Sequence, residues 1–478
     1  MSQMRGQVAF FLNGKLHQVS GSTCFLTLSD YLRRENALTG TKVVCAEGDC
    51  GACSVLKSSP VFLATPKPHF EMVNSCIALV AQMDGCVLLT VEALGELNNL
   101  HPVQKAMYES HASQCGFCTP GFVVAMVDMF ESHKGACSEQ EIKNHLTGNL
   151  CRCTGYQSII EAAKSQSSDL YLHLRKKYLG KTVVETLTKF CRKALMVESQ
   201  EAVLLAPCSK SELISVIKKH PKAVMIAAGT DLGVQRNKHG RRPPVLISLH
   251  LIKELYETKF LKDKVVVSAR VTFSELRKSL LKKCPTVANF LDVFASPQIK
   301  NVATLVGNVA NGSPIADAPP FLFALNARIK VLSSKTEKLI EIPIVDFYLD
   351  YRKLKLKTGE LIWSVSFDLP SKNETLYLQK ITQRKDLDIS CVNVGFWSKK
   401  SSKAKLSDLR LALGGVAATP VRLQKTEKAF LKNQNLEEAL KIAQSEISPL
   451  SDLRGSSAYR RLVVHNYLKD FLSKQVSL

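Results

Sequence analysis

Polar and apolar positions alternate at the start of the chain in the manner of a β-hairpin. In QVAFFLNGKLHQVS (7–20) two apolar runs flank Asn13 and Gly14, the pair that best accepts the two positive φ angles of a type I′ turn. TLSDYLRREN (27–36) then places three apolar residues on one helical face. GCVLLTVEAL (85–94) has the apolar run of a closing strand. This β-β-α-β order predicts a small half-open sheet that grasps one helix.

From His101 the spacing of apolar residues becomes that of helices. One helix is predicted to begin just after His101, at a proline, which suits a first turn. A second has Thr119 as its expected cap, followed by Pro120 at the first helical position. A third begins with a capping box formed by Ser138 and Glu141. The pattern predicts two antiparallel helix pairs.

The rest of the chain divides into a linker and a mixed region. Residues 166–197 are polar and basic, without a clear core pattern, and are predicted to link domains. Strands and helices alternate from about residue 198. Long antiparallel strands are expected in 374–397 and 406–423. Amphipathic helices are expected in 436–447 and 457–474.

Length and composition are those of a globular protein with several domains. The 478 residues predict about three or four domains, and 45% hydrophobic and 22% charged residues are ordinary values. No apolar run reaches the roughly 18 residues needed to cross a bilayer. The first ten residues lack the features of a secretory signal, so we expect a cytoplasmic protein. In that compartment fifteen cysteines indicate metal or redox use rather than disulfides.

The net charge of +22 is unevenly distributed. Residues 1–160 carry −2, and the remainder carries +24. A basic chain raises the question of nucleic-acid binding. Because the lysines and arginines are dispersed and no nucleic-acid-binding motif accompanies them, we do not expect a nucleic-acid partner. A basic half that handles anionic dinucleotides, or that docks on an acidic partner, explains the charge equally well.

Four cysteines near the N-terminus have the spacing of an iron–sulfur site. Cys45, Cys50 and Cys53 follow the pattern C-x4-C-x2-C in CAEGDCGACS, and Cys76 lies further along. This is the plant-type [2Fe–2S] arrangement. The two glycines between the cysteines allow a tight loop whose N–H groups point at cluster sulfides. Zinc usually takes two close pairs separated by a longer loop, which fits this spacing less well.

A second group of four cysteines is ambiguous when taken alone. Cys115 and Cys118 lie in SQCGFCTPG, and Cys151 and Cys153 lie in NLCRCTGY. This spacing suits zinc or an iron–sulfur cluster. The first pair precedes one predicted helix and the second follows another, so antiparallel helices would bring the four together. A site without carboxylate or imidazole ligands suits an electron carrier.

Two loops of small residues are candidates for binding a dinucleotide. They are MIAAGTDLGVQ (225–235) and NVATLVGNVANGSPIADAPP (301–320). Small residues let backbone amides approach a pyrophosphate, and the hydroxyl and amide side chains add donors. Each loop alone is a weak signal, because loops rich in Gly and Asn are mostly turns. Neither contains G-x-G-x-x-G, so a Rossmann fold is not predicted.

A plant-type ferredoxin domain followed by QCGFCTPG and GNLCRCTGY resembles the iron–sulfur half of the molybdenum hydroxylase family. Xanthine dehydrogenase, aldehyde oxidase and carbon monoxide dehydrogenase belong to that family. The two small-residue loops resemble its FAD domain, and LALGGVAATPVRL resembles its flavoprotein C-terminal domain. The resemblance implies a multidomain α+β fold: a β-grasp ferredoxin-like domain at 5–90, an all-α four-helix [2Fe–2S] domain at 91–165, a linker at 166–197, an α/β FAD-binding domain without a Rossmann fold at 198–370, and an α+β C-terminal domain with an antiparallel sheet at 371–478.

The resemblance also assigns site residues. It implies [2Fe–2S] ligands at Cys45, Cys50, Cys53 and Cys76, and at Cys115, Cys118, Cys151 and Cys153. It implies FAD contacts at Ala227, Ala228, Gly229, Thr230, Asp231 and Leu232 around the pyrophosphate, at Thr304, Gly307, Asn308 and Ser313 in the second loop, and at Asp317, Phe294 and Lys380. Gln114 would contact the pterin of the molybdenum cofactor. The sequence departs from the family at Val306 and Ala228, where the family often has glycine.

Iron–sulfur and FAD domains together, with the molybdenum domain elsewhere, resemble the small subunit of bacterial xanthine dehydrogenase. The implied partner is a molybdenum-binding large subunit, in a heterotetramer with two copies of each. The implied reaction oxidises hypoxanthine and xanthine, with NAD as electron acceptor. The substrate site would then lie in the partner, so no catalytic residue is expected in this chain. The alternatives are another molybdenum hydroxylase acting on aldehydes or N-heterocycles, a free-standing iron–sulfur flavoprotein, and a zinc-stapled binding module.

Overall fold

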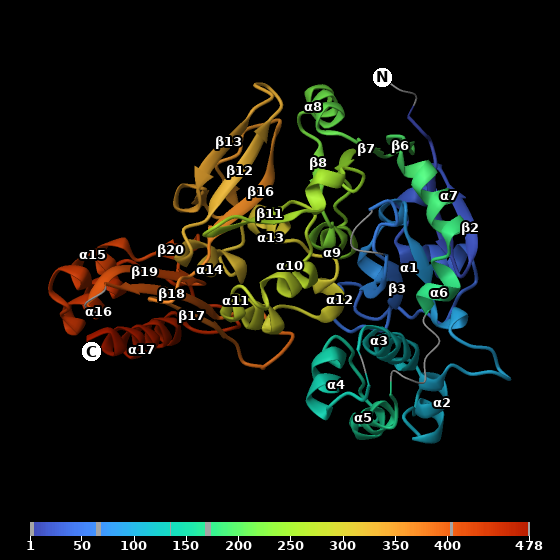
Figure 1. Ribbon diagram of the computed structural model, residues 1–478, viewed down its shortest axis with the longest axis horizontal. Helices are drawn as coiled ribbons and strands as arrows, with labels where there is room; N and C mark the ends of the chain where they lie inside the picture. Colours follow the sequence, from blue (N-terminus) through green and yellow to red (C-terminus); the bar gives the residue numbers. More distant parts are fainter. Residues whose placement is uncertain (1–3, 64–67, 134, 168–173, 402–404, 477–478) are drawn as a thin grey trace. The chain divides into compact units, whose positions relative to one another are not determined.

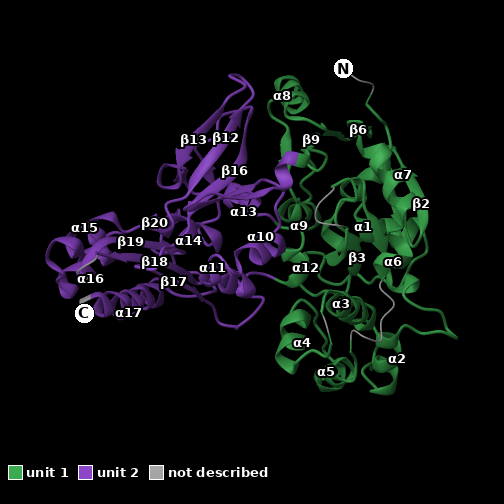
Figure 2. Cartoon of the chain, in the orientation of Figure 1, with its two compact units in different colours: residues 1–253, 296–303 green, residues 254–295, 304–478 purple. Residues whose placement is uncertain are grey.

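The chain forms two compact units (Figures 1 and 2). The computed structural model describes residues 4–63, 68–133, 135–167, 174–401 and 405–476. Unit 1 consists of residues 1–253 and 296–303, and unit 2 consists of residues 254–295 and 304–478. The chain therefore leaves unit 1, returns to it for one short segment, and then completes unit 2.

Unit 1 begins with a five-stranded sheet in the order β2-β1-β5-β3-β4. Its strands are β1 (Val8–Leu12), β2 (Lys15–Val19), β3 (Ser54–Ser58), β4 (Phe70–Asn74) and β5 (Val87–Leu89). The predicted hairpin is confirmed, with Asn13 and Gly14 at φ 50° and 85°. Strand β5 closes the sheet by pairing parallel to β1. Strands β3 and β4 are not predicted from the alternation of residues, because most of their positions are buried.

One helical segment packs against this sheet. It runs through α1 (Leu28–Asp30) and the π-helical turn η2 (Tyr31–Glu35). Leu28, Tyr31 and Leu32, the three residues predicted to share a face, are all buried in the same core as Val8 and Phe10 of β1. The β-grasp arrangement expected from the sequence is therefore present.

Four helices follow and form an all-α domain. They are α2 (Pro102–Glu109), α3 (Thr119–Ser132), α4 (Glu139–Leu146) and α5 (Gln157–Lys164), with α2 packed on α5 and α3 on α4. The predicted capping box of α4 is confirmed. The cap predicted for α3 is wrong by one residue, since Cys118 is the N-cap and Thr119 is the first helical residue. The Thr119 hydroxyl donates to Ser113 Oγ, 2.9 Å away, instead of capping the helix.

The segment predicted as a linker contains two helices, α6 (Leu174–Tyr178) and α7 (Lys181–Cys191), and its residues 168–173 lie outside the described part of the chain. A four-stranded sheet follows in the order β6-β7-β9-β8. Its elements are β6 (Leu195–Glu198), β7 (Val203–Ala206), α8 (Lys210–Lys219), β8 (Val224–Ile226), α9 (Thr230–His239) and β9 (Val245–Ser248). Strand β9 pairs parallel to both β7 and β8, in the part of the chain where strands and helices are predicted to alternate.

A buried ion pair joins this second sheet to the first. The carboxylate of Asp84, next to β5, pairs with the Arg5 guanidinium and accepts a hydrogen bond from the Ala9 amide at 2.9 Å. His250, just after β9, lies with Nε2 3.0 Å from the other Asp84 oxygen, and its Nδ1 lies 2.8 Å from Ser248 Oγ. Although burial opposes ionisation, hydrogen bonds with His250 and Arg5 lower the pKa of Asp84 to about 2.

Within the described residues, unit 2 contains two larger sheets and one small sheet of two strands, β14 (Tyr348–Asp350) and β15 (Lys353–Leu354). The first of the larger sheets has the order β10-β11-β16-β12-β13, with every neighbouring pair antiparallel. Its strands are β10 (Thr258–Phe260), β11 (Lys264–Ser268), β12 (Arg328–Ser333), β13 (Leu339–Pro343) and β16 (Glu360–Asp368). Four helices of this unit precede the second larger sheet in the chain: α10 (Phe273–Leu280), α11 (Pro285–Phe290), α13 (Leu305–Asn311) and α14 (Ala318–Ala324). Helix α13 packs against β11 and β16 of the first larger sheet, whereas α11 and α14 pack against strands of the second.

The second of the larger sheets has the predicted long antiparallel strands, in the order β17-β18-β19-β20. They are β17 (Glu374–Ile381), β18 (Val392–Lys400), β19 (Leu406–Gly414) and β20 (Val421–Arg422). The helices α15 (Gln424–Asn433), α16 (Leu436–Ser445) and α17 (Ser457–Val476) complete it. The expected multidomain α+β fold is confirmed. Among the described helices, none is both long and apolar enough to span a bilayer.

Candidate cofactor sites

The first four predicted cysteines are brought together in unit 1. Cys45 and Cys50 lie on a loop before β3, Cys53 ends that loop, and Cys76 lies in a short turn after β4. Hydrogen bonds with the thiols of Cys50 and Cys76 lower the pKa of Cys45 well below its usual value. The Cys76 thiol likewise lowers the pKa of Cys53. Four thiols in mutual contact are the donor set that a [2Fe–2S] cluster requires.

The loop around these cysteines has the conformation that a cluster needs. Ala46, Gly48 and Gly51 all have positive φ, at 55°, 80° and 68°. Such turns direct backbone N–H groups inward, and the Asp49 amide already donates to Cys45 Sγ at 3.4 Å. The Asn74 side-chain amide donates to Cys53 Sγ at 3.7 Å. Donors of this kind stabilise the extra negative charge of a reduced cluster.

Helix α9 lies directly on this loop. The Asn237 side-chain amide donates to the carbonyl oxygens of Ala46 at 2.9 Å and Cys76 at 2.8 Å. A side chain at Gly233 would meet a carbonyl, because a Cβ there would lie 2.0 Å from the Ile77 oxygen. Sequence analysis did not identify Asn237, since a single asparagine in a polar helix carries no local signal.

The other four predicted cysteines also come together in unit 1. Cys115 Sγ and Cys153 Sγ are 3.5 Å apart, and the thiols of Cys118 and Cys151 are hydrogen-bonded to each other. Burial opposes ionisation of Cys151, but hydrogen bonds with the Thr154 hydroxyl, and from the Thr154 and Cys153 amides, lower the pKa of Cys151 to about 7. Nowhere in the described ranges do three His, Cys, Asp or Glu side chains surround one ion position. In the second group the thiols contact each other in two pairs, whereas in the first group Cys45 contacts Cys50 and Cys76, and Cys76 contacts Cys53, so that all four are linked.

The two cysteine groups are neighbours. The Leu150 amide, next to Cys151, donates to the Cys50 carbonyl at 3.0 Å. The Asn149 side chain donates to the Gly51 carbonyl at 3.4 Å. The loops that carry the two groups are therefore in direct contact.

One side of the second group is exposed. Cys115 and Cys153 are exposed, and so is Gln114. Phe117 and Leu150 lie beside them with 47% and 51% of their surface exposed. This face combines apolar side chains, an amide and two thiols.

The first predicted FAD loop lies in unit 1, at the turn from β8 into α9. Gly229 adopts φ 79° and caps the helix, so the amides of Thr230, Asp231 and Leu232 form its first turn. The Ala228 carbonyl accepts a hydrogen bond of 2.5 Å from the Gln82 side chain of the ferredoxin-like domain. Amides at a helix N-terminus that follows a tight turn suit a pyrophosphate. Ala227 completes the loop between β8 and that turn.

The second predicted loop lies in unit 2. Thr304 caps α13, its hydroxyl accepting from the Gly307 amide at 3.0 Å. The Asn308 side chain accepts from the amide of Ala318, the first residue of α14, at 3.4 Å. Ser313 forms a local turn by accepting from the Ile315 amide at 3.4 Å. The second loop thus contains the N-termini of two successive helices, α13 and α14.

Asp317 and Lys380, both predicted FAD contacts, are paired with each other. Lys380 Nζ lies 2.9 Å from Asp317 Oδ2 and donates to the Val293 carbonyl at 3.3 Å. The other Asp317 oxygen accepts from the Ser390 hydroxyl at 2.6 Å and from the Asn393 amide at 3.0 Å. Sequence analysis did not identify Ser390 or Asn393.

Phe294, the third predicted FAD contact in this part of unit 2, is the chain neighbour of Val293, whose carbonyl accepts from Lys380. Phe294 directly follows Val293 and is buried against Phe273, with ring centroids 4.1 Å apart. Two predicted FAD contacts of unit 2 therefore form a half-buried ion pair, and the third, Phe294, directly follows the residue whose carbonyl accepts from Lys380.

Four family models match successive parts of the chain. They describe a 2Fe-2S iron-sulfur cluster binding domain (10–81), a [2Fe-2S] binding domain (90–164), an FAD binding domain in molybdopterin dehydrogenase (198–370) and a CO dehydrogenase flavoprotein C-terminal domain (377–475). The chain carries the iron–sulfur and FAD portion of a molybdenum hydroxylase. The two cysteine groups described above fall in the two iron–sulfur domains, and their eight thiols fit the cofactor that those domains hold.

Curated relatives cover nearly all of this iron–sulfur and FAD portion. Xanthine dehydrogenase 1 of Arabidopsis thaliana is 30% identical over 98% of the chain, which spans 39% of that protein. Xanthine dehydrogenase/oxidase of Mus musculus is 30% identical over 90% of the chain, which spans 36% of that protein. The chain thus spans about two fifths of the length of these relatives.

Solved structures share the fold. A Cu,Mo-CO dehydrogenase chain has a TM-score of 0.51 and 24% identity, over 56% of this chain and 94% of that one. A chain of quinoline 2-oxidoreductase from Pseudomonas putida 86 has a TM-score of 0.50 and 23% identity, over 56% of this chain and 95% of that one.

Proposed function

We propose that this chain carries electrons from a molybdenum cofactor in a partner subunit to NAD, in an enzyme that oxidises hypoxanthine and xanthine to urate. The observation that carries the proposal is the contact of the two cysteine loops through Leu150 and Cys50, together with α9 on the first loop. One helix thereby links a predicted flavin loop to a cysteine group that touches the second group. The similarity to xanthine dehydrogenases supports the choice of purine substrate.

The chain's own residues would have three tasks in this function. The eight cysteines would hold two [2Fe–2S] clusters, and the amides near them would stabilise negative charge on the sulfurs. Residues 227–232 would hold the FAD pyrophosphate with backbone amides, and Thr304, Gly307, Asn308 and Ser313 would supply further donors. When bound, the clusters and FAD would supply the exchange between one-electron and two-electron carriers.

The unit 2 ion pair would hold a lysine in place for the flavin. Asp317, fixed by Ser390 and Asn393, orients Lys380 beside the Val293 carbonyl, next to Phe294. Because these contacts already order the Lys380 side chain, it would bind an anionic or polar group of FAD with little further loss of conformational entropy.

The exposed face near the second cysteine group would receive the partner. Gln114 presents an amide that both donates and accepts, which suits the mixed edge of a pterin. Phe117 and Leu150 supply apolar surface around it. We propose a molybdenum-binding large subunit at this face, in a heterotetramer of two copies of each chain located in the cytoplasm.

The test is to purify the chain anaerobically together with the molybdenum-binding subunit and to follow NAD reduction by xanthine. We expect iron, acid-labile sulfide and FAD in the complex, and purine-dependent formation of NADH. Oxidation of aldehydes or other N-heterocycles in place of purines would contradict the substrate while leaving the electron-carrying role intact. Tightly bound zinc with no iron would refute the whole proposal.

A further inference from the structure

The short segment 296–303 lies in unit 1, although the residues on both sides of it belong to unit 2. It contains the helical turn α12 (Pro297–Lys300), in which Ser296 Oγ accepts from the Ile299 amide at 3.2 Å. Ile299 packs against the apolar cluster of Cys53, Cys76 and Ile77. A segment from the middle of the flavin domain therefore forms part of the first cysteine site.

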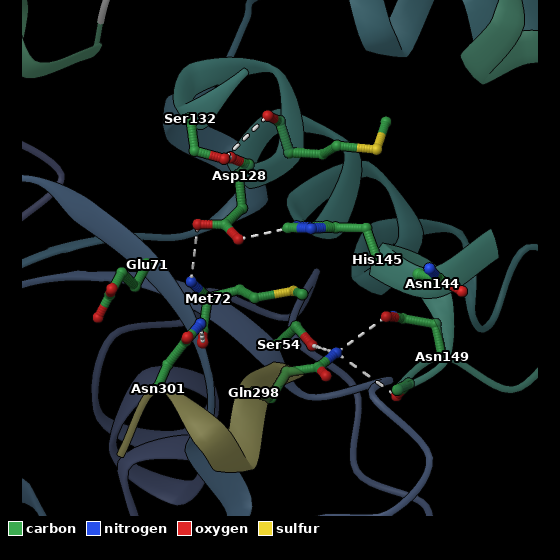
Figure 3. Close-up of polar contacts among 12 residues, drawn as sticks. Ser54, Glu71, Met72, Asp128, Ser132, Asn144, His145, Asn149, Gln298 and Asn301 are labelled. Atoms are coloured by element: carbon green, nitrogen blue, oxygen red, sulfur yellow. Dashed lines mark hydrogen bonds and ion pairs between the residues drawn. The ribbon is translucent and has the colours of Figure 1, made fainter. Parts of the chain in front are cut away.

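Gln298 of this segment reaches both cysteine domains (Figure 3). Its side-chain amide donates to Ser54 Oγ at 3.2 Å, one residue after Cys53. The same amide donates to Asn149 Oδ1 at 2.8 Å and to the Gly148 carbonyl at 3.4 Å, in the loop that leads to Cys151. The side chain is completely buried.

The local geometry favours an amide at this position over other side chains. Three oxygen acceptors surround the NH2 group of Gln298. A carboxylate at this position has no hydrogen to donate and would place its own oxygens against them. Gln298 Oε1 has no hydrogen-bond partner within the described residues, so its burial is a cost that the NH2 contacts must offset. Position 148 must also be small, since a Cβ there would lie 1.8 Å from Gln298 Oε1.

A second set of polar contacts lies beside Gln298 in the same view (Figure 3). The Asn301 side chain donates to the Met72 carbonyl at 3.0 Å. The Met72 amide donates to Asp128 of α3 at 3.1 Å, and Asp128 lies 2.9 Å from His145 of α4. Segment 296–303 thus takes part in polar contacts that join the ferredoxin-like and helical domains both at Gln298 and at Met72.

We propose that Gln298 is a positioning residue that fixes the two cysteine loops relative to each other, so that the flavin domain itself sets the spacing across which the two clusters exchange electrons. The proposal rests on the function proposed above for its electron-transfer meaning. The structural part of the proposal, that Gln298 holds the Ser54 and Asn149 loops together through its hydrogen bonds, does not depend on that function. Gln298 does not contact the sulfurs in this assignment, and it acts through the loops on either side.

The experiment compares the full chain with Gln298→Met, Gln298→Glu and Gly148→Ala variants. Methionine keeps the side-chain volume of Gln298 but donates no hydrogen bond, and glutamate replaces the donating NH2 group by an acceptor. Alanine at position 148 places a methyl group against the Gln298 side chain and so displaces it without changing residue 298. Gln140→Met is the matched control, because it makes the same change at an exposed position of α4, where the amide bonds Asn144 at 2.8 Å. Two readouts are measured: hydrogen exchange at the Leu150 amide, and the magnetic interaction between the two reduced clusters in low-temperature EPR.

We expect exchange at Leu150 to accelerate roughly tenfold in the Gln298 variants, while core amides of α3 keep the wild-type rate. We also expect a weaker EPR interaction with iron and flavin contents unchanged, and wild-type values for Gln140→Met. Wild-type exchange and EPR interaction in Gln298→Met would overturn the proposal. If the wild-type chain binds no iron, the proposed function fails, and exchange at Leu150 still decides the role of Gln298. If Gln298→Glu does not fold, Gln298→Met and Gly148→Ala supply the same comparison.

Discussion

The Leu150 amide donates a hydrogen bond to the Cys50 carbonyl across 3.0 Å, and so connects a residue of one cysteine group to the neighbour of Cys151 in the other. A path from the Cys50 thiol to the Cys151 thiol therefore crosses only covalent bonds and this one hydrogen bond. Asn149 adds a second contact through the Gly51 carbonyl. The two groups are therefore parts of one continuous structure, although they lie in different domains.

We predict that the two groups give separable iron signals. Cys53→Ser should remove one EPR signal of the reduced protein, and Cys118→Ser should remove the other, because each group supplies its own four ligands. Iron content should fall by about half in each variant, as expected when one of two sites with four thiolate ligands is lost. Cys284→Ser, at a buried thiol outside both groups, is the control and should keep both signals. Loss of both signals in each single variant would contradict two independent sites.

We predict that Asn237 affects the first cluster alone. Asn237→Asp would place a carboxylate against the Ala46 and Cys76 carbonyls, and negative charge near a cluster disfavours its reduction. The reduction potential of the first cluster should fall in an EPR-monitored redox titration, with the second cluster as an internal reference. Asn237→Leu should destabilise the contact by about 1–3 kcal/mol without adding charge. Equal shifts in both potentials would show that the variant acts through the whole unit.

We predict that the Asp84 ion pair makes unit 1 sensitive to acid. The folded pKa of about 2 lies below the ordinary value of 3.8, so the ionised carboxylate stabilises the fold above pH 4. That contribution, on the order of 2 kcal/mol, should be lost as the pH falls from about 4 toward 2. Urea unfolding at several pH values measures it.

The Asp84→Asn variant tests the same ion pair at neutral pH. It should cost about 3–5 kcal/mol, because it leaves the buried Arg5 guanidinium without its counter-ion. Glu109→Gln, in an exposed pair with Lys105, is the control and should change the stability by less than about 1 kcal/mol. A wild-type unfolding midpoint for Asp84→Asn would exclude a stabilising role for the pair.

We predict that Lys380→Met and Asp317→Ala both reduce FAD retention and leave both iron signals intact. Lys380→Met removes the cation that faces Asp317, and Asp317→Ala releases the lysine from its fixed position. Flavin absorbance after gel filtration measures retention. Lys385→Met, at an exposed position a few residues further along, is the control and should retain FAD. Wild-type flavin content in both Lys380→Met and Asp317→Ala would refute the assignment of these residues to the flavin.

Local patterns in the sequence predict local structure here, and the limits of that prediction are physical. The hairpin at Asn13-Gly14 and the capping box at Ser138 are set by residues close in the chain, and both are confirmed. The spacing of the cysteines likewise indicates which thiols belong together. Thr119 shows where such a pattern fails, since a hydroxyl with a nearby alternative partner does not cap its helix.

Contacts between distant segments are not encoded in periodicity. Asn237 meets the Ala46 carbonyl across 191 positions of sequence, and Gln298 meets Asn149 across 149 positions. In the sequence both are single polar residues in polar surroundings, which is the pattern of an exposed helix or loop. Ser390 and Asn393 are similar cases, because their role depends on an aspartate that precedes them by more than 70 residues.

The return of segment 296–303 to unit 1 also affects the order of events during synthesis. Gln298 leaves the ribosome roughly 7 to 30 seconds after Asn149, at about 5–20 residues per second. Throughout that interval the eight cysteines have been translated, but the buried amide that joins their loops has not. The N-terminal half of the chain therefore cannot reach its final packing as an independent nascent domain, and the junction closes only when the stretch after Phe294 emerges.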